Sequence, residues 1–198
     1  TYAEVGGRVV IQSENPSNRE ITPAPGGGVW KIRPDESTAG DGVDNIGNAS
    51  GGFVQATPDY TNVPTPPGAG GAGPNVAPSI EYRIAITNAG TYRLWHRSAA
   101  DSPNGNADSM FIDIVELKDG GGGPIEDWYA SGTAANNNFS NSWRGNGTGE
   151  STASPGTGDT LTWTLAPGVY TVRFTMREDG AAIDQFLLQS VGGTPSGA

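Results

Sequence analysis

The residue types that drive covalent catalysis are scarce in this sequence. Its 198 residues include no cysteine and a single histidine, His96, which excludes thiol nucleophiles, disulfides and multi-histidine metal centres. No Gly-x-Ser-x-Gly turn is present to hold a serine nucleophile. A pair of carboxylates, as in glycosidases, is the one catalytic arrangement that the composition leaves open. The small size and the strand pattern described below speak against it, and we expect no enzyme.

Tryptophans outside the regular segments indicate a binding chemistry. Trp143 stands in the polar stretch NSWRGNGTGE, Trp128 lies in the same long segment, and Trp30 follows a run of three glycines. A tryptophan on a loop can stack on the apolar face of a sugar, while polar neighbours fix the orientation of the ligand. The alternative for each ring is an anchor that folds onto the protein core. We therefore predict that Trp143, Trp128 and Trp30 contact carbohydrate.

Charged residues beside the expected turns are candidates for the same site. Arg177, Glu178 and Asp179 precede a glycine between two expected strands, and Asp108 precedes another strand. An arginine fork and carboxylate acceptors can bind sugar hydroxyls. The alternatives are a solvated turn, or an ion pair between Arg177 and Asp108 inside the molecule.

The elements that must position these residues are strands. Gly (31) and Pro (15) are abundant, and no long segment has an uninterrupted helical period of apolar residues. Short segments with alternating or continuous apolar residues are separated by turn residues, which is typical of a β-sandwich. We predict strands over Arg8 to Glu14, Phe53 to Ala56, Ser79 to Ile86, Thr91 to Arg97, Ser109 to Leu117, Thr160 to Leu165, Val169 to Met176 and Ala182 to Gln189.

Two long segments lack strand character and are expected to be loops, 58–78 and 119–157. Trp95 and Trp163 fall inside the predicted strands, so we expect both in the core. Residues 1–191 are predicted to form a single all-β jelly-roll sandwich with long Gly/Pro-rich loops, and residues 192–198 a tail or linker stub.

The charge of the chain limits its partners. A net charge of −10 argues against binding to nucleic acid or to an anionic membrane surface. No apolar run approaches the roughly 18 residues of a membrane span, so membrane insertion is not expected. The absence of cysteine, the low charge and the abundance of small polar residues favour a secreted, extracellular or cell-surface protein.

Four segments in the same order resemble one known family. The opening, Ala3 to Asn15, resembles the first strand of carbohydrate-binding modules of the family 6 and family 35 type. Ala89 to Trp95 and Asp108 to Asp113 resemble two middle strands, and Leu165 to Leu188 resembles the last two. The resemblance implies a galactose-binding-domain-like jelly roll that binds a polysaccharide or other glycan and catalyses nothing.

The resemblance also implies a structural calcium ion between the first and last strands. The residues at the matching positions are Gln12, Glu14 and Asp184, although a glutamate is common in the family where Gln12 stands. Calcium takes six to eight oxygen ligands from carboxylates, amides and carbonyls. The alternative is that Glu14 and Asp184 are ordinary carboxylates at strand ends.

A second function class uses the same sandwich. A secreted homo-oligomer or polymer, such as a surface layer or filament, would employ the jelly roll as a building block.

Overall fold

A computed structural model of the protein describes residues 1–19, 28–36, 46, 49–57, 78–99, 109–118, 124–130, 139, 143, 145, 161–176 and 180–190. Within these ranges the chain forms strands and no helix, so no helix there is long and apolar enough to cross a membrane. The strands are β1 (Tyr2–Ala3), β2 (Arg8–Gln12), β3 (Asn18–Arg19), β4 (Val29–Arg33), β5 (Phe53–Thr57), β6 (Ser79–Ile86), β7 (Gly90–Ala99), β8 (Ser109–Lys118), β9 (Pro124–Ala130), β10 (Thr162–Leu165), β11 (Gly168–Met176) and β12 (Ala182–Ser190).

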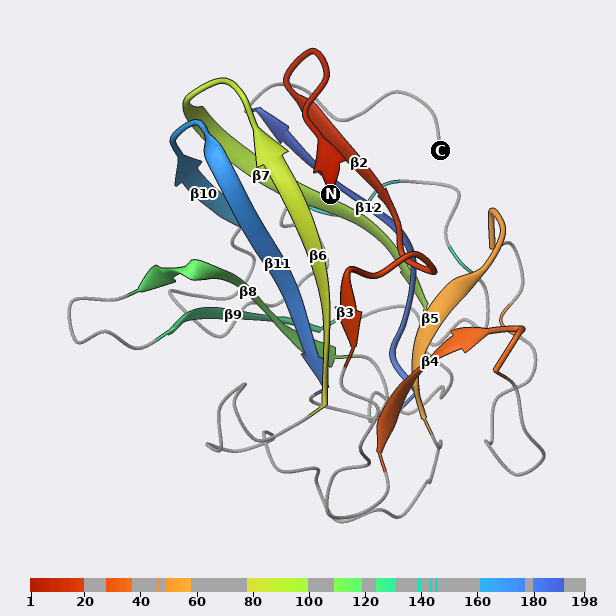
Figure 1. The fold of residues 1–198 in the computed structure, drawn as a ribbon. Helices are drawn as coiled ribbons and strands as arrows, with labels where there is room; N and C mark the ends of the chain where they lie inside the picture. The colour runs from red at the N-terminus through yellow and green to blue at the C-terminus, as the bar shows by residue number, and fades with distance from the viewer. Residues whose placement is uncertain are drawn as a thin grey trace.

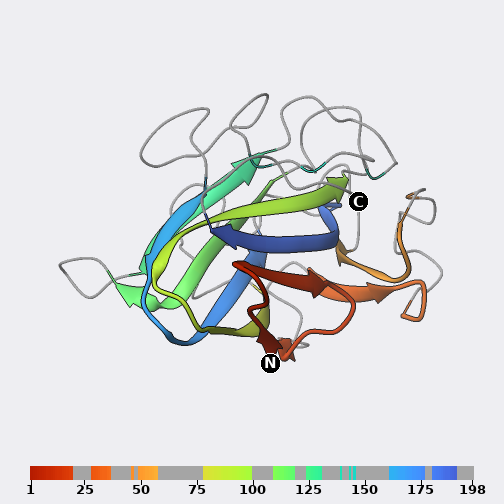
Figure 2. The same cartoon turned by 90° about the horizontal axis from the view of Figure 1, so that it is seen from above.

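The strands form two sheets that pack as a sandwich (Figures 1 and 2). Sheet A has the order β1-β6-β11-β8-β9, and β3 also pairs with β6. Sheet B has the order β10-β7-β12-β5-β4, and β2 also pairs with β12. The two-residue pairing of β1 with β6 is parallel, and the other pairings of named strands among the described residues are antiparallel. The predicted all-β sandwich is confirmed.

Alternating residues of the two sheets fill the space between them. In β6 the buried positions are Ile80, Tyr82, Ile84 and Ile86, which alternate with more exposed residues. Apolar residues on one face of each strand leave water together when the sheets stack, which is the main driving force of this fold.

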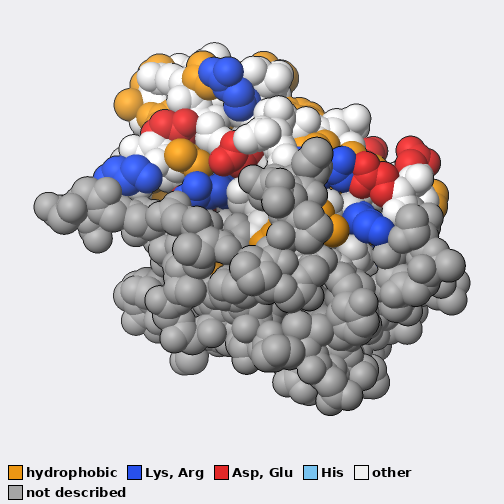
Figure 3. Space-filling model, turned by 60° about the horizontal axis from the view of Figure 1, so that its bottom comes forward, with side chains coloured by type: hydrophobic (Ala, Val, Ile, Leu, Met, Phe, Trp, Pro, Cys, Tyr) orange, Lys and Arg blue, Asp and Glu red, His pale blue; other side chains and the backbone are white. Residues whose placement is uncertain are grey.

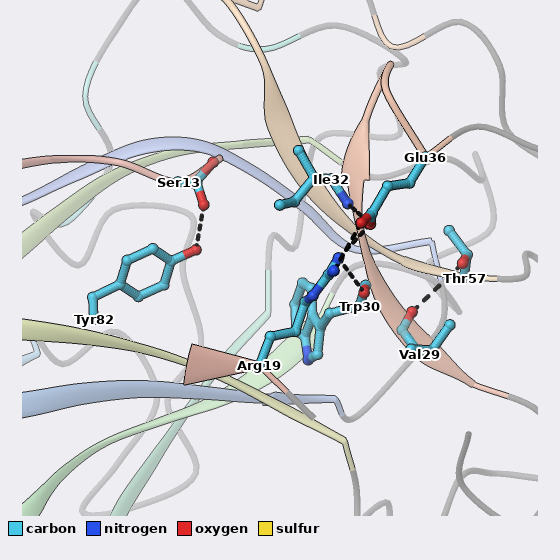
Figure 4. Close-up of polar contacts among 8 residues, drawn as sticks. All are labelled: Ser13, Arg19, Val29, Trp30, Ile32, Glu36, Thr57 and Tyr82. Carbon is cyan, nitrogen blue, oxygen red and sulfur yellow. Dashed lines mark hydrogen bonds and ion pairs between the residues drawn. The ribbon is translucent and has the colours of Figure 1, made fainter. Parts of the chain in front are cut away.

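An aromatic cluster marks the centre of the core. Tyr82, Phe174 and Phe186 pack edge to face, with ring centroids 4.8 to 6.0 Å apart. The Tyr82 hydroxyl donates a hydrogen bond of 2.6 Å to the carbonyl of Ser13 (Figure 4). Trp163 belongs to the same core, as predicted.

Part of the outer face of sheet B is buried as well. Trp95, Ala99 and Leu187 lie on that face and are at most 3% exposed. Phe139 packs there beside Ala99, with its ring edge against Phe53 at 5.2 Å between centroids. Trp95 is therefore buried, as predicted, although it lies on the outer side of its sheet rather than between the two sheets.

Glu4 ties the start of the chain to the turn between β6 and β7. Its carboxylate accepts hydrogen bonds from the backbone N–H groups of Thr87 (2.7 Å) and Asn88 (3.0 Å). The side chains of the same two residues also donate to it, at 3.0 and 2.7 Å. The predicted turn at Asn88 is present, and Glu4 caps it.

All eight predicted strands are present, but four strands were not predicted. β1 and β3 have two residues each, and β4 follows a glycine run. β9 lies inside 119–157, where a loop was expected, so that prediction is wrong for Pro124–Ala130. β9 is an edge strand that begins with proline, the place in a sheet where a missing N–H costs least. Residues 58–77 and the predicted tail lie outside the described part of the chain, and the division at residue 191 stays a prediction.

Candidate functional site

Trp143 sits between two points of the chain that are fixed on sheet B. Phe139, four residues earlier, is 1% exposed in the cluster on the outer face of that sheet. Gly145, two residues later, lies so close to β7 that an added Cβ would stand 2.4 Å from the carbonyl oxygen of Leu94. Trp143 itself keeps part of its surface in contact with solvent. Trp143 is thus partly exposed and lies in sequence between Phe139 and Gly145, two residues that contact sheet B.

Trp30 is in the core, which corrects its prediction as a ligand contact. The side chain is 0% exposed, and its indole N–H donates a 3.0 Å hydrogen bond to the carbonyl of Pro78. Trp30 is at an inward position of β4, opposite Ala56 of β5. A ring without exposed surface cannot stack on a sugar, so Trp30 follows the alternative of a core anchor.

An ion pair between Arg19 and Glu36 lies beside the backbone carbonyl of Trp30. The Arg19 guanidinium binds the Glu36 carboxylate through two nitrogens, one of them at 2.7 Å, and also donates to the Trp30 carbonyl at 3.4 Å (Figure 4). These hydrogen bonds from Arg19, opposed by burial, hold the pKa of Glu36 below its usual range. The pair is structural, because both groups are occupied by each other.

For Trp128 the structure gives the position of the backbone. It lies in β9 and pairs in register with Phe111 of β8. Arg177, Glu178, Asp179 and Asp108 lie outside the described residues, and their role in glycan binding stays a prediction.

Sheet A carries a row of charged positions that we did not predict from the sequence. Glu81, Arg173, Asp113 and Glu126 are successive register partners across β6, β11, β8 and β9. Arg173 binds both carboxylate oxygens of Asp113, at 3.0 and 2.8 Å. Burial raises the pKa of Asp113, and the hydrogen bonds from Arg173 offset only part of that effect. Charged residues at outward positions of neighbouring strands were the signal available in the sequence, but the strand order was needed to align them.

The surface in Figure 3 fits this mixed character. Basic and acidic side chains of the described residues lie interspersed on the face shown. Opposite charges that alternate over a surface do not create a strong field of one sign. The described part of this face therefore has no obvious preference for a polyanion.

The three predicted calcium ligands are mostly committed to protein partners. The Gln12 side-chain carbonyl accepts a 3.1 Å hydrogen bond from Gln185. The Asp184 carboxylate accepts from the backbone N–H and hydroxyl of Ser50 and forms an ion pair with Arg97. Glu14 keeps one buried oxygen, Oε2, without a hydrogen-bond partner.

This donor set does not fit a calcium ion as it stands. Calcium needs six to eight oxygens, and among the three predicted ligands Glu14 offers the uncommitted carboxylate oxygen. Within the described residues, no three acidic, histidine or cysteine side chains are grouped so that they could hold a metal. The guanidinium of Arg97 already provides a positive charge at Asp184.

Comparison with known proteins gives relatives in fold only. No family model and no curated protein matches the sequence. A family 35 carbohydrate binding module from Clostridium thermocellum matches in structure at 15% identity and a TM-score of 0.45, covering 93% of this chain and 98% of the module. The carbohydrate binding module CBM6cm-2 from Cellvibrio mixtus lichenase 5A, solved with cellotriose, matches at 13% identity and a TM-score of 0.44, covering 92% of this chain and 97% of that module.

A larger enzyme contains a similar region. The Podospora anserina GH26-CBM35 β-(1,4)-mannanase matches at 16% identity and a TM-score of 0.48 over 96% of this chain, which spans 29% of the enzyme's length. Families 35 and 6 are the two that the sequence resembles. Likeness at this level concerns the sandwich and does not carry a ligand or a binding site over to this chain.

Proposed function

We propose that this chain is a non-catalytic, extracellular carbohydrate-binding module that holds a polysaccharide or other glycan against Trp143. The observation that supports the proposal most directly is that Trp143 is partly exposed and lies in sequence between the buried Phe139 and the tightly packed Gly145. A ring held in place before the ligand arrives loses little conformational entropy on binding, which favours affinity.

The neighbours of Trp143 in sequence fit this role. The sequence around Trp143 contains Asn141, Ser142, Arg144 and Asn146, whose amide, hydroxyl and guanidinium groups are of the types that bind sugar hydroxyls. An indole covers the apolar C–H face of a sugar, while such groups select its hydroxyl pattern. We propose Trp128, Arg177, Glu178, Asp179 and Asp108 as further contacts.

The experiment compares Trp143→Ala with the wild type. A screen on a glycan array identifies a ligand, and isothermal titration then measures its Kd. Removing one stacking ring should weaken binding by about tenfold or more, since the buried area of one sugar face is worth roughly 1 to 3 kcal/mol. The melting temperature should fall less than it would for a fully buried tryptophan, because Trp143 keeps part of its surface exposed.

Tyr170→Ala is the matched control. Tyr170 is another partly exposed aromatic residue, in sheet A, and its loss should leave glycan affinity unchanged. A Trp143→Ala variant with a much lower melting temperature but an unchanged Kd for glycan would show that the ring is a structural anchor. A variant that folds and binds normally but no longer self-associates in light scattering would favour the assembly alternative instead.

A further inference from the structure

The buried ion pair of Arg97 and Asp184 lies at an irregular point of sheet B. The pairing of β12 with β7 shifts its register between Ile183 and Gln185, so Asp184 stands at a bulge. Bulges often turn a side chain in a direction that the regular strand does not allow. The Asp184 carboxylate is 0% exposed and lies 2.7 Å from a guanidinium nitrogen of Arg97, whose side chain is 5% exposed.

The rest of the Asp184 carboxylate is also bound. Its Oδ1 accepts from the Ser50 hydroxyl at 2.9 Å, and both oxygens are within 3.2 Å of the Ser50 N–H. Gln185 extends the network, because its side-chain N–H group donates to the Ser50 hydroxyl at 2.7 Å and to the Gln12 carbonyl at 3.1 Å. The network therefore joins β2, β7, β12 and the segment before β5.

We infer that Arg97 is the resident cation of this junction, and that the fold uses its guanidinium where the resemblance implies calcium. A buried carboxylate needs a positive charge nearby, and an arginine provides one that is ionised at every physiological pH. A divalent cation at Asp184 would have to displace Arg97 and the Ser50 donors, or stand beside a buried positive charge. The strands at this junction are then held together without a metal ion.

The first test uses the wild-type protein. Its melting temperature should be the same in EDTA and in millimolar calcium, and it should not sensitise terbium luminescence. A rise in melting temperature with calcium that EDTA reverses would overturn the inference, as would saturable terbium binding that Asp184→Asn abolishes.

The second test removes the cation. Arg97→Met leaves Asp184 buried without its counter-charge and should lower the melting temperature by about 10 °C. Asp184→Asn in the Arg97→Met background should recover about half of that loss, because the uncompensated charge is gone while the Ser50 donors keep an acceptor. If the two substitutions are additive, the pair is not coupled and the inference fails.

Arg83→Met is the matched control. Arg83 is an exposed strand arginine in β6, and its replacement should leave the melting temperature nearly unchanged. If Arg97→Met does not fold, the wild-type measurements with EDTA, calcium and terbium still decide the question. The inference is independent of glycan binding, so failure of either proposal leaves the other standing.

Discussion

At the scale of single residues, Glu4 shows how a carboxylate can hold a turn. Burial raises the pKa of Glu4, but the hydrogen bonds from Asn88 and Thr87 outweigh it and lower the value to about 2. The folded state thus takes up its proton at lower pH than the unfolded chain does. The contribution of Glu4 to stability is complete above the unfolded value of 4.5 and is lost as the pH falls towards 2.

We therefore expect Glu4→Gln to lower the melting temperature at pH 7, since the charged acceptor of the Thr87 and Asn88 donors is gone. The difference in melting temperature between Glu4→Gln and the wild type should shrink as the pH falls from 4.5 to about 2. These are the pKa values of Glu4 in the unfolded and folded states. Thermal melts followed by circular dichroism across this range measure it. The exposed Glu116, which binds Thr171 through water-accessible hydrogen bonds, is the control, and Glu116→Gln should cost less. A constant difference at every pH would contradict the role of the charge.

Single residues also show where the sequence was sufficient. The core position of Trp163 followed from the alternation of its strand, because an inward residue of a sandwich strand is buried whatever its partner. The burial of Trp30 did not follow, because a glycine run hid the strand that turns the ring inward. The ion-pair partner of Asp184 could not be predicted either. Arg97 is far from Asp184 in sequence, and only the pairing of β7 with β12 brings the two together.

At the scale of elements, Gly145 controls where the segment near Trp143 lies. Its φ of +137° is in a region that favours glycine, and an added Cβ would meet the Leu94 carbonyl at 2.4 Å. Backbone cannot give way as a flexible side chain does, so Gly145→Ala must push this segment away from β7.

The expected result of Gly145→Ala is a loss of glycan affinity similar to that of Trp143→Ala, together with a moderate fall in melting temperature. Titration and calorimetry on the same preparation measure both. Gly6→Ala provides the comparison, because Gly6 has φ +59° but open space around it, and the change should cost only about 1 kcal/mol of backbone strain. Unchanged affinity in Gly145→Ala would mean that this contact does not position Trp143.

The strands that were predicted have a stronger sequence pattern than those that were missed. β6, β7, β11 and β12 are long and carry several apolar residues, so their pattern stands above chance. β9 has proline at its first position and two consecutive charged residues, Glu126 and Asp127, at its middle, a pattern that predicts a loop when the segment is considered alone. Its pairing with β8, and not its own residues, makes it a strand.

At the scale of the whole molecule, the final strands hold the sandwich together. β11 lies between β6 and β8 in sheet A, and β12 of sheet B pairs with β7, with β5 and with β2. A chain that ends at residue 160 lacks the centre of both sheets and the Phe174 and Phe186 rings of the aromatic cluster. It should therefore remain unfolded, with no cooperative thermal transition by circular dichroism.

A chain that ends at residue 191 keeps every described strand and serves as the control. It should melt at the same temperature as the full chain, which also tests the predicted boundary between domain and tail. A folded 1–160 fragment would show that the first strands form a stable unit alone and would contradict the central role of β11 and β12.

The pairing of β2 with β12 has a mechanical consequence. Arg8, at the start of β2, pairs with Gln189, near the end of β12, so the chain leaves this ladder in both directions from the same end. Tension applied through residues 1 and 190 would first release the pairing of β1 and the hydrogen bonds of Glu4 to Thr87 and Asn88. It would then load the end of the ladder, where Ser190 bonds Gly7 and Gln189 pairs with Arg8. The hydrogen-bonded pairs of the ladder would then break one after another. In a shear geometry, by contrast, all of its hydrogen bonds would carry the force together. Pulled from its ends, this domain should yield at low force.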